Sequence, residues 1–348
     1  MKKYSAKEIS KKDSALKESS LKKSFSKKVL VIGGAGYIGS HIVDALCAAG
    51  HDVTVFDNLS SGFEENLDNK IRNKAKLFKG DITNISDLDR VFSGKFDAVF
   101  HFAALKSVGD SMERPEKYSS NNITGTLNVL NTMIKYGVKN FVFSSTAAVY
   151  GTPKYLPIDE KHPADPESYY GFTKLEIERF LGWYSRLKGI HFAALRYFNA
   201  AGYSSGKCME KDPGNLLPIV LEVASGRRKE LQVYGNDYDT VDGTGVRDYI
   251  HVLDLADAHL RAMDYIMHEK KDLIVNLSTQ TGSSVLEVVH EAEKITGKKI
   301  AYRIVPRRAG DTATVVASSG LARKMLGWVP RHSSMKEIIS SMWGVYRR

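Results

Sequence analysis

The 348-residue sequence lacks any run of about eighteen uncharged apolar residues, which excludes a membrane-spanning helix. It is also poor in cysteine, since Cys47 and Cys208 are too few for a disulfide framework or a cysteine-based metal site. We therefore expect no metal and a reducing, cytoplasmic setting. With 43% hydrophobic and 26% charged residues, the composition is that of a folded globular protein and not of a disordered one. A chain of this length usually forms two lobes.

Acidic residues are the minority among the charged ones: 50 lysines and arginines stand against 40 acidic residues, a net charge of +10. Such an excess can indicate nucleic-acid binding. However, residues 1–28 hold ten lysines and only three acidic residues, so +7 of the charge lies there. This segment is also rich in serine and poor in large apolar residues, and we predict a disordered basic tail over residues 1–28.

Two other interpretations of the tail compete with this one. A transit peptide is disfavoured because such peptides prefer arginine to lysine. An electrostatic anchor for anionic lipid or nucleic acid stays open, but no aromatic residues interleave the lysines to stack on bases. We therefore expect no nucleic-acid partner.

From Val29 onward, short apolar runs alternate with stretches of helical spacing. Buried runs of this kind, separated by helices, are typical of a doubly wound parallel sheet, a Rossmann-type α/β fold. We assign residues 29–195 to this domain and residues 196–348 mainly to a smaller α/β lobe, with exchange of chain between the two. The predicted strands are 29–32, 53–56, 76–78, 98–100 and 140–143, and the predicted helices are 37–49, 115–136 and about 167–187.

A glycine turn follows the first predicted strand. Its spacing is G-x-x-G-x-x-G, with glycines at Gly33, Gly36 and Gly39, and it opens a helix. Glycine permits the tight turn and lets backbone N–H groups approach a pyrophosphate at the positive end of the helix. A merely flexible turn is disfavoured because strand, glycines, helix and a following acidic residue occur in the order that a dinucleotide site requires.

The acidic residue is Asp57, at the end of the second predicted strand. A carboxylate at this position accepts hydrogen bonds from ribose hydroxyls and repels a 2′-phosphate. Asn58 and Leu59 follow it, without an arginine to bind that phosphate, so the predicted cofactor is NAD and not NADP. Asp81 and Ile82, after the third strand, are placed to meet the adenine end.

Tyr170 and Lys174 are spaced to share one face of a predicted helix. A phenol is a poor base at neutral pH until positive charge nearby favours the phenolate, and Lys174 supplies one such charge. The Y-x-x-x-K spacing alone is weak evidence of a catalytic site, because tyrosine and lysine are both common on exposed helix faces. It gains weight from Ser144, Ser145 and Thr146 at a strand end, where a hydroxyl can hydrogen-bond a reacting alcohol or ketone.

These residues resemble the extended short-chain dehydrogenases/reductases, and the similarity narrows to the UDP-glucose 4-epimerase family. It extends from about Val29 to Pro330, and the segment Gly243–His251 is its most specific part. The other matching segments are Phe56–Leu59, His101–Lys106, Asn121-Asn122, Arg196–Asn199 and Arg307–Asp311.

The resemblance implies a hydride cycle on tightly held NAD. Tyr170 would take the proton of the sugar 4-hydroxyl while Thr146 and Lys174 orient and polarise the site. The resulting 4-keto sugar would rotate about its link to the diphosphate and receive the hydride on its other face. The remaining residues expected at the cofactor are Tyr37, Ile38, Asn58, Phe102, Ala103, Ala104, Lys106, Asn121, Ser144 and Tyr197, with Lys106 also near the substrate.

The resemblance also places the nucleotide-sugar, UDP-glucose or UDP-galactose. Arg247 and Arg308 suit the diphosphate because one guanidinium group can bind two phosphate oxygens at once. A surface ion pair with Asp248 or Asp311 is the alternative interpretation of these arginines. The substrate residues expected besides Lys106, Thr146 and Tyr170 are Asn199, Asn215, Leu216, Tyr234, Arg247, Arg308, Asp311 and Val315.

Val315 stands where some family members carry a bulky tyrosine that closes the sugar pocket. Its small size predicts that UDP-N-acetylhexosamines are accepted as well. The alternatives are an epimerase specific for UDP-N-acetylglucosamine, or one for another UDP-sugar such as a pentose or uronate. The family commonly forms homodimers through a helix pair, here residues 115–136 and 167–187.

Other activities of the same fold are disfavoured. A nucleotide-sugar 4,6-dehydratase needs Asp-Glu after the strand-end threonine, and a decarboxylating relative needs a Glu there, but this sequence has Ala147 and Ala148. A redox-sensing protein that binds NAD without catalysis is disfavoured because Tyr170 and Lys174 are both present.

Overall fold

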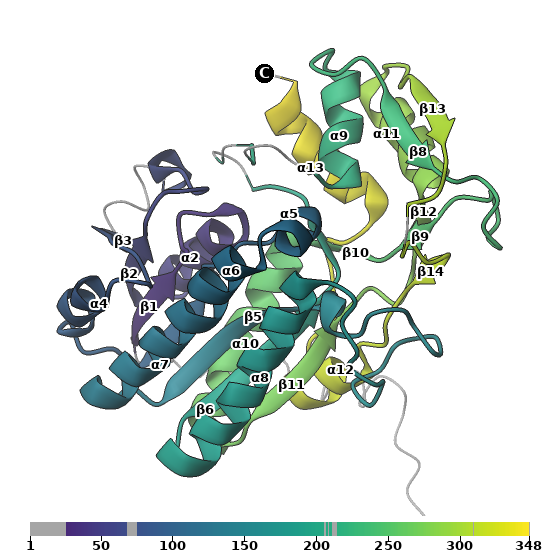
Figure 1. The fold of residues 1–348 in the computed structure, drawn as a ribbon. Helices are drawn as coiled ribbons and strands as arrows, with labels where there is room; N and C mark the ends of the chain where they lie inside the picture. Colours follow the sequence, from purple (N-terminus) through teal and green to yellow (C-terminus); the bar gives the residue numbers. More distant parts are fainter. Residues whose placement is uncertain are drawn as a thin grey trace, which may run out of the picture.

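The computed structural model describes residues 26–67, 75–204, 207, 209–210, 214–308 and 310–347. Two lobes are visible, with the larger one built around a parallel sheet (Figure 1). Most of the predicted basic tail, as well as Cys208 and Ala309, lies outside the described residues. Lys28, the last residue of that predicted tail, is the first residue of strand β1.

The sheet of the larger lobe has seven strands in the order β11-β6-β5-β4-β1-β2-β3, and every neighbouring pair is parallel. The order turns back between β1 and β4, which is the point where a doubly wound sheet opens a crevice. The predicted strands are confirmed. The bounds are β1 Lys28–Ile32, β2 Asp52–Asp57, β3 Ala75–Lys79, β4 Ala98–His101, β5 Asn140–Thr146, β6 His191–Tyr197 and β11 Leu273–Leu277.

Helices cover both faces of this sheet (Figure 1). Successive residues of β1 point to opposite faces: Val29 and Val31 join one core, and Leu30 and Ile32 join the other. The first core is completed by α2 (Tyr37–Ala48), α10 (Val252–Glu269) and α12 (Gly320–Leu326). The second is completed by α4 (Ile85–Phe92), α7 (Gly125–Tyr136) and α8 (Tyr169–Lys188).

Residues 252–277 lie against the large sheet although they come late in the sequence. They follow the Gly243–His251 segment, yet α10 covers the first core and β11 pairs with β6 at the edge of the sheet. The larger lobe is therefore not one continuous stretch of sequence. The predicted division at residue 195 falls within β6, whose last two residues are Arg196 and Tyr197.

The predicted helix 115–136 is helical throughout but not α-helical throughout. It consists of α6 (Pro115–Tyr118), a π-helical segment η2 (Ser119–Thr124) and α7. Inside the π segment the side chain of Asn122 holds the loop after β4, because it exchanges two hydrogen bonds of 2.9 and 3.0 Å with the backbone of Leu105. π-Helical turns inside helices are often found at functional sites.

The smaller lobe has its own apolar core between α9 (Leu216–Ala224), α11 (Val285–Thr296), α13 (Met335–Tyr346) and the strand β8 (Leu231–Tyr234). Figure 1 shows these helices grouped above the carboxyl ends of the large sheet. The other elements are β7 Asn199–Ala201, β9 Val246–Arg247, β10 Tyr249–His251, β12 Ser283–Ser284, β13 Tyr302–Val305, β14 Thr314–Val315, α5 Val108–Glu113, and the short 3₁₀ helices η1 Glu64–Asn66 and η3 Ala147–Val149. In the part of the chain that the structure describes, no helix is long and apolar enough to cross a membrane.

Candidate active site

The glycine turn joins β1 to α2 at the point where the sheet order turns back. A Cβ at Gly39 would lie 2.2 Å from the carbonyl oxygen of Gly33, so only glycine fits the start of α2. Gly33 has a φ of +78°, and a Cβ there would lie 2.5 Å from the backbone nitrogen of Ala103 after β4. The turn therefore leaves backbone, and not side chains, facing the crevice, which is the arrangement that a pyrophosphate needs.

Asp57, at the end of β2, is buried, and its carboxylate is already hydrogen-bonded. It accepts bonds of 2.9 Å from the backbone of Ala35 and 2.8 Å from that of Leu59. Burial raises the pKa of Asp57, although these two hydrogen bonds oppose the rise. Because each carboxylate oxygen can accept a second bond, the group both fixes the glycine turn and remains able to bind a ribose.

These elements border a cavity of about 470 Å³. Nearly every residue predicted to bind the cofactor lines it. Asp81 does not; its carboxylate instead accepts bonds from Asn58 (2.7 Å) and from the backbone of Thr83 (2.8 Å), and so orients Asn58. The lining residues that were predicted are Gly33, Gly36, Tyr37, Ile38, Gly39, Asp57, Asn58, Ile82, Phe102, Ala103, Ala104, Lys106, Asn121, Ser144, Tyr170, Lys174 and Tyr197.

Tyr170 and Lys174 lie in the first turns of α8, at one end of this cavity. The helix begins there because Ser168 caps it by accepting a 3.1 Å hydrogen bond from the backbone of Gly171. The Lys174 ammonium donates a 2.9 Å bond to the carbonyl of Ser144, and the Ser144 hydroxyl pairs with that of Tyr197. Thr146 hydrogen-bonds Tyr170. The structure thus brings the helix residues and the ends of β5 and β6 together.

Burial sets the acid–base properties of this group. It raises the pKa of Tyr170 to about 12 and lowers that of Lys174 to about 7, while the hydrogen bond with Thr146 opposes the rise at Tyr170. At neutral pH the phenol is therefore protonated until a further positive charge enters the cavity. A cationic ring bound beside Tyr170 supplies such a charge, which couples the basicity of the phenol to cofactor binding.

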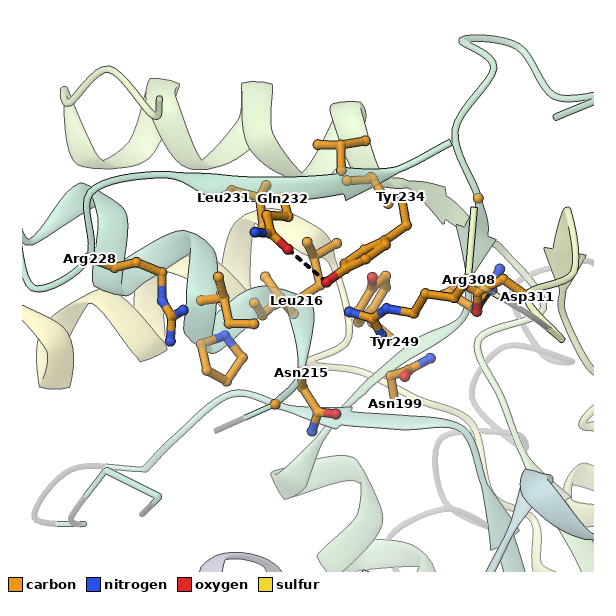
Figure 2. A pocket seen from close by; sticks show the side chains of 18 of the residues that line it. Asn199, Asn215, Leu216, Arg228, Leu231, Gln232, Tyr234, Tyr249, Arg308 and Asp311 are labelled. Carbon is orange, nitrogen blue, oxygen red and sulfur yellow. Dashed lines mark hydrogen bonds and ion pairs between the residues drawn. The ribbon is translucent and has the colours of Figure 1, made fainter. Parts of the chain in front are cut away.

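A second cavity of about 380 Å³ lies in the smaller lobe. Figure 2 shows Arg308 and Asp311 at one end, Arg228 at the other, and Tyr234 between them. The predicted substrate residues that line it are Asn199, Asn215, Leu216, Tyr234, Arg247, Arg308 and Asp311.

The two predicted diphosphate arginines differ in their surroundings. Arg308 forms no ion pair among the described residues, and its guanidinium lies 3.7 Å above the ring of Tyr234. Arg247 contacts Asp311 at 3.5 Å and donates a 2.9 Å bond to the carbonyl of Thr312. Arg308 is therefore not part of a surface ion pair, and its charge is available to an anion.

Asp248 is the acidic residue next to Arg247 in the sequence. Its carboxylate is fully buried and accepts bonds from the backbone (3.0 Å) and hydroxyl (2.7 Å) of Thr279. Its backbone carbonyl accepts 3.1 and 2.9 Å bonds from the backbone and side chain of Asn199. Asp248 therefore holds the segment that follows Arg247 against β7, the strand that begins at Asn199.

Two of the predicted substrate residues line neither cavity. Thr146 is placed beside Tyr170 by its hydrogen bond. Val315 on β14 pairs with Arg247 on β9. The side chain of Val315 packs against an apolar cluster that includes Val149, three residues after Thr146. Both residues therefore lie between elements of the first cavity and elements of the second.

Sequence reasoning missed several lining residues. Ser60, Ser61, Phe63 and Asn66 border the first cavity after β2, and Arg228, Gln232 and Tyr249 border the second. Tyr249 lies within the Gly243–His251 segment, so the family resemblance could have identified it. The other six belong to no spaced motif, and nothing in the sequence distinguishes them from other loop or strand residues. Lys106, which was predicted, forms an ion pair with Glu210, and both line the first cavity.

Comparison with known proteins identifies relatives along nearly the whole chain. The profile of the NAD dependent epimerase/dehydratase family matches residues 29–278. A UDP-glucose 4-epimerase of Lacticaseibacillus casei is 45% identical over 319 residues, which cover 90% of this chain and 95% of that protein. The human UDP-glucose 4-epimerase is 46% identical, with coverage of 87% and 92%.

Solved structures give the same result. A UDP-glucose 4-epimerase of Brucella ovis in complex with NAD superimposes with a TM-score of 0.89 at 38% identity, covering 92% of this chain and 99% of that one. A UDP-glucose 4-epimerase of Bifidobacterium longum in complex with NAD+ and UDP has a TM-score of 0.85 at 42% identity, with coverage of 91% and 97%.

Proposed function

Since this chain belongs to the NAD dependent epimerase/dehydratase family, we propose that it is an NAD-dependent UDP-hexose 4-epimerase that interconverts UDP-glucose and UDP-galactose. One observation carries the proposal. A cavity bordered by the glycine turn and Asp57 ends at Tyr170 and Lys174, and a second cavity holds Arg247 together with Arg308, which has no acidic partner among the described residues. This combination suits a substrate with a reacting alcohol at one end and a diphosphate at the other.

The residues divide the chemistry between them. NAD, when bound, takes up and returns the hydride at C4 of the sugar. Tyr170 accepts the proton of the 4-hydroxyl and later gives it back, and Thr146 holds that phenol by its hydrogen bond. Lys174, fixed on the Ser144 carbonyl, supplies the charge that favours the phenolate. Arg247 and Arg308 grip the diphosphate while the keto sugar turns over.

The related activities remain disfavoured. The residues after Thr146 are Ala147 and Ala148 in η3, so the chain has no carboxylate there to eliminate water from the sugar. The relatives named above are UDP-glucose 4-epimerases, which favours a hexose over a pentose or a uronate as the sugar.

The test is a coupled assay on the purified full-length protein, with UDP-galactose as substrate and formation of UDP-glucose as the signal. We expect the same equilibrium mixture to form from either sugar without added reductant. Protein that contains NAD but leaves both sugars unchanged would overturn the proposal, and irreversible formation of a dehydrated 4-keto sugar would indicate a dehydratase.

Val315 supports a wider sugar range, and we infer that UDP-N-acetylhexosamines are also substrates. Replacing it with tyrosine places a large ring next to the Val149 cluster, between the two cavities. For Val315→Tyr we expect at least about a tenfold loss of activity on UDP-N-acetylglucosamine, while activity on UDP-glucose stays within about threefold. Parallel assays on the two sugars check this, and equal losses on both would contradict it.

We further infer that the protein is a homodimer. Phe172, Trp183 and Leu187 expose 38%, 55% and 69% of their surface along one face of α8, and apolar residues of α5 are exposed as well. Trp183→Glu combined with Leu187→Glu should halve the mass measured by light scattering. Val241→Glu is the matched control, because Val241 is fully exposed elsewhere; a monomeric wild-type protein would disprove the dimer. The cytoplasmic location expected from the two cysteines stays a prediction.

A further inference from the structure

Behind the catalytic group lies a buried chain of polar side chains. Glu178 on α8 accepts a 2.9 Å bond from the Nε of Arg196 and makes a second contact to its guanidinium. It also accepts a 2.5 Å bond from the hydroxyl of Ser145. Arg196 donates a 2.9 Å bond to Tyr150, whose hydroxyl donates a 2.7 Å bond to Asn276 on β11. These five residues are 0–6% exposed, and none lines either cavity.

The three central residues of this chain lie close in sequence to the residues of the catalytic group. Ser145 stands between Ser144 and Thr146 on β5, and Arg196 precedes Tyr197 on β6. Ser145 and Arg196 are also direct partners in the register of the two strands. Glu178 lies one turn after Lys174 and two turns after Tyr170, on the same face of α8.

Stability alone does not explain a buried ion pair. Removing two charges from water has a large cost, so apolar residues of similar size are often equally stabilising. The bidentate pair of a guanidinium and a carboxylate does have strict geometry. The pair therefore fixes the distance and orientation between α8 and the ends of β5 and β6. Apolar packing constrains such geometry less strictly.

We propose that the Glu178–Arg196 pair is a positioning device that sets the register of Tyr170 and Lys174 against the strand ends carrying Ser144, Thr146 and Tyr197. The pair touches neither sugar nor cofactor. This inference rests on the proposed function, because it concerns the geometry of that reaction.

The charge of Glu178 also acts on the catalytic pair. Glu178 on α8 and His101 on β4 interact electrostatically with the Lys174 ammonium, and the ring of Tyr170 lies 6.0 Å from it. Arg196 on β6 pairs with Glu178, and Tyr197 on β6 interacts with Tyr170. His101 is neutral, since burial lowers its pKa to about 3. Glu178 raises the pKa of Lys174 against the larger effect of burial. Without that negative charge, the Tyr170–Lys174 pair releases its first proton at lower pH.

The test compares Glu178→Gln with Glu176→Gln as the matched control. Glu176 lies on the same helix in an exposed ion pair with Arg179. For Glu178→Gln we expect kcat on UDP-glucose to fall about 10- to 100-fold, with KM and NAD content almost unchanged. The acidic limb of the kcat profile should move to lower pH by about one unit. Glu178→Asp should recover part of the rate, and the control should behave as the wild type.

A double variant, Glu178→Leu with Arg196→Leu, separates positioning from folding. Neither charge is left unpaired in it, so we expect a thermal midpoint near that of the wild type and a kcat still reduced at least about tenfold. Full kcat in the double variant, or in Glu178→Gln, would overturn the positioning role. A wild-type protein without epimerase activity would instead count against the proposed function itself, with which this inference would also fall.

Discussion

Tyr170→Phe is expected to reduce epimerase turnover by about 10²- to 10⁴-fold, the usual contribution of a positioned acid–base group. The phenol is the group that Thr146 hydrogen-bonds and that lies 6.0 Å, at its ring centre, from the Lys174 ammonium. Phenylalanine keeps the ring and removes only the hydroxyl. NAD should therefore still co-purify with the variant, because the glycine turn and Asp57 are untouched. Turnover on UDP-galactose and the NAD released on denaturation are the two measurements.

The neighbouring Tyr169 provides a matched control. Its hydroxyl contacts Ser119 at 2.5 Å, and it lines neither cavity. Tyr169→Phe removes the same atom one residue away, and its turnover should stay within about threefold of the wild type. If both variants lost activity equally, or if Tyr170→Phe remained active, Tyr170 would not be the acid–base residue.

Gly33→Ala is expected to have the largest effect on folding and cofactor retention. Its φ of +78° costs an alanine about 1–2 kcal/mol. The added methyl group would also lie 2.5 Å from the backbone nitrogen of Ala103, and such overpacking costs about 1–3 kcal/mol more. Because the clash pushes β1 and β4 apart where the crevice opens, NAD should be lost together with stability. Denaturant unfolding and NAD content measure the two effects.

Gly137 provides a control that measures the cost of a positive φ alone, without a steric clash. It ends α7 with a φ of +75°, almost the same as Gly33, but nothing lies within 4 Å of the Cβ position. Gly137→Ala should therefore destabilise the protein by only about 1–2 kcal/mol and leave NAD bound. Equal destabilisation by the two substitutions would show that the close approach of the strands at Gly33 is unimportant.

The parts of the fold and site that could be predicted from the sequence depend on local spacing. The glycine turn needs three glycines within seven residues, and the Tyr170–Lys174 pair needs one helical turn. Each is complete within a short segment, so its geometry follows from the element that holds it. The buried runs of β1 to β5 are of the same kind.

The features that escaped prediction depend on contacts between distant segments. The π-helical turn follows from bonds between Asn122 and Leu105, and the edge strand β11 is defined by its pairing with β6. The Glu178–Arg196 pair did have a signal: an arginine within the apolar strand β6, and an acid one turn after Lys174. That signal becomes interpretable only when α8 is known to pack on β6.

The return of residues 252–277 to the large sheet has a consequence for how the protein folds during synthesis. When the ribosome has made residues 28–197, six of the seven strands exist, but β6 still has an open edge and the face that α10 covers is bare. Both are completed only after the Gly243–His251 segment has been made. The lobe with the glycine turn therefore cannot reach its final stability before Arg247, the first of the two arginines proposed to bind the diphosphate, has been made.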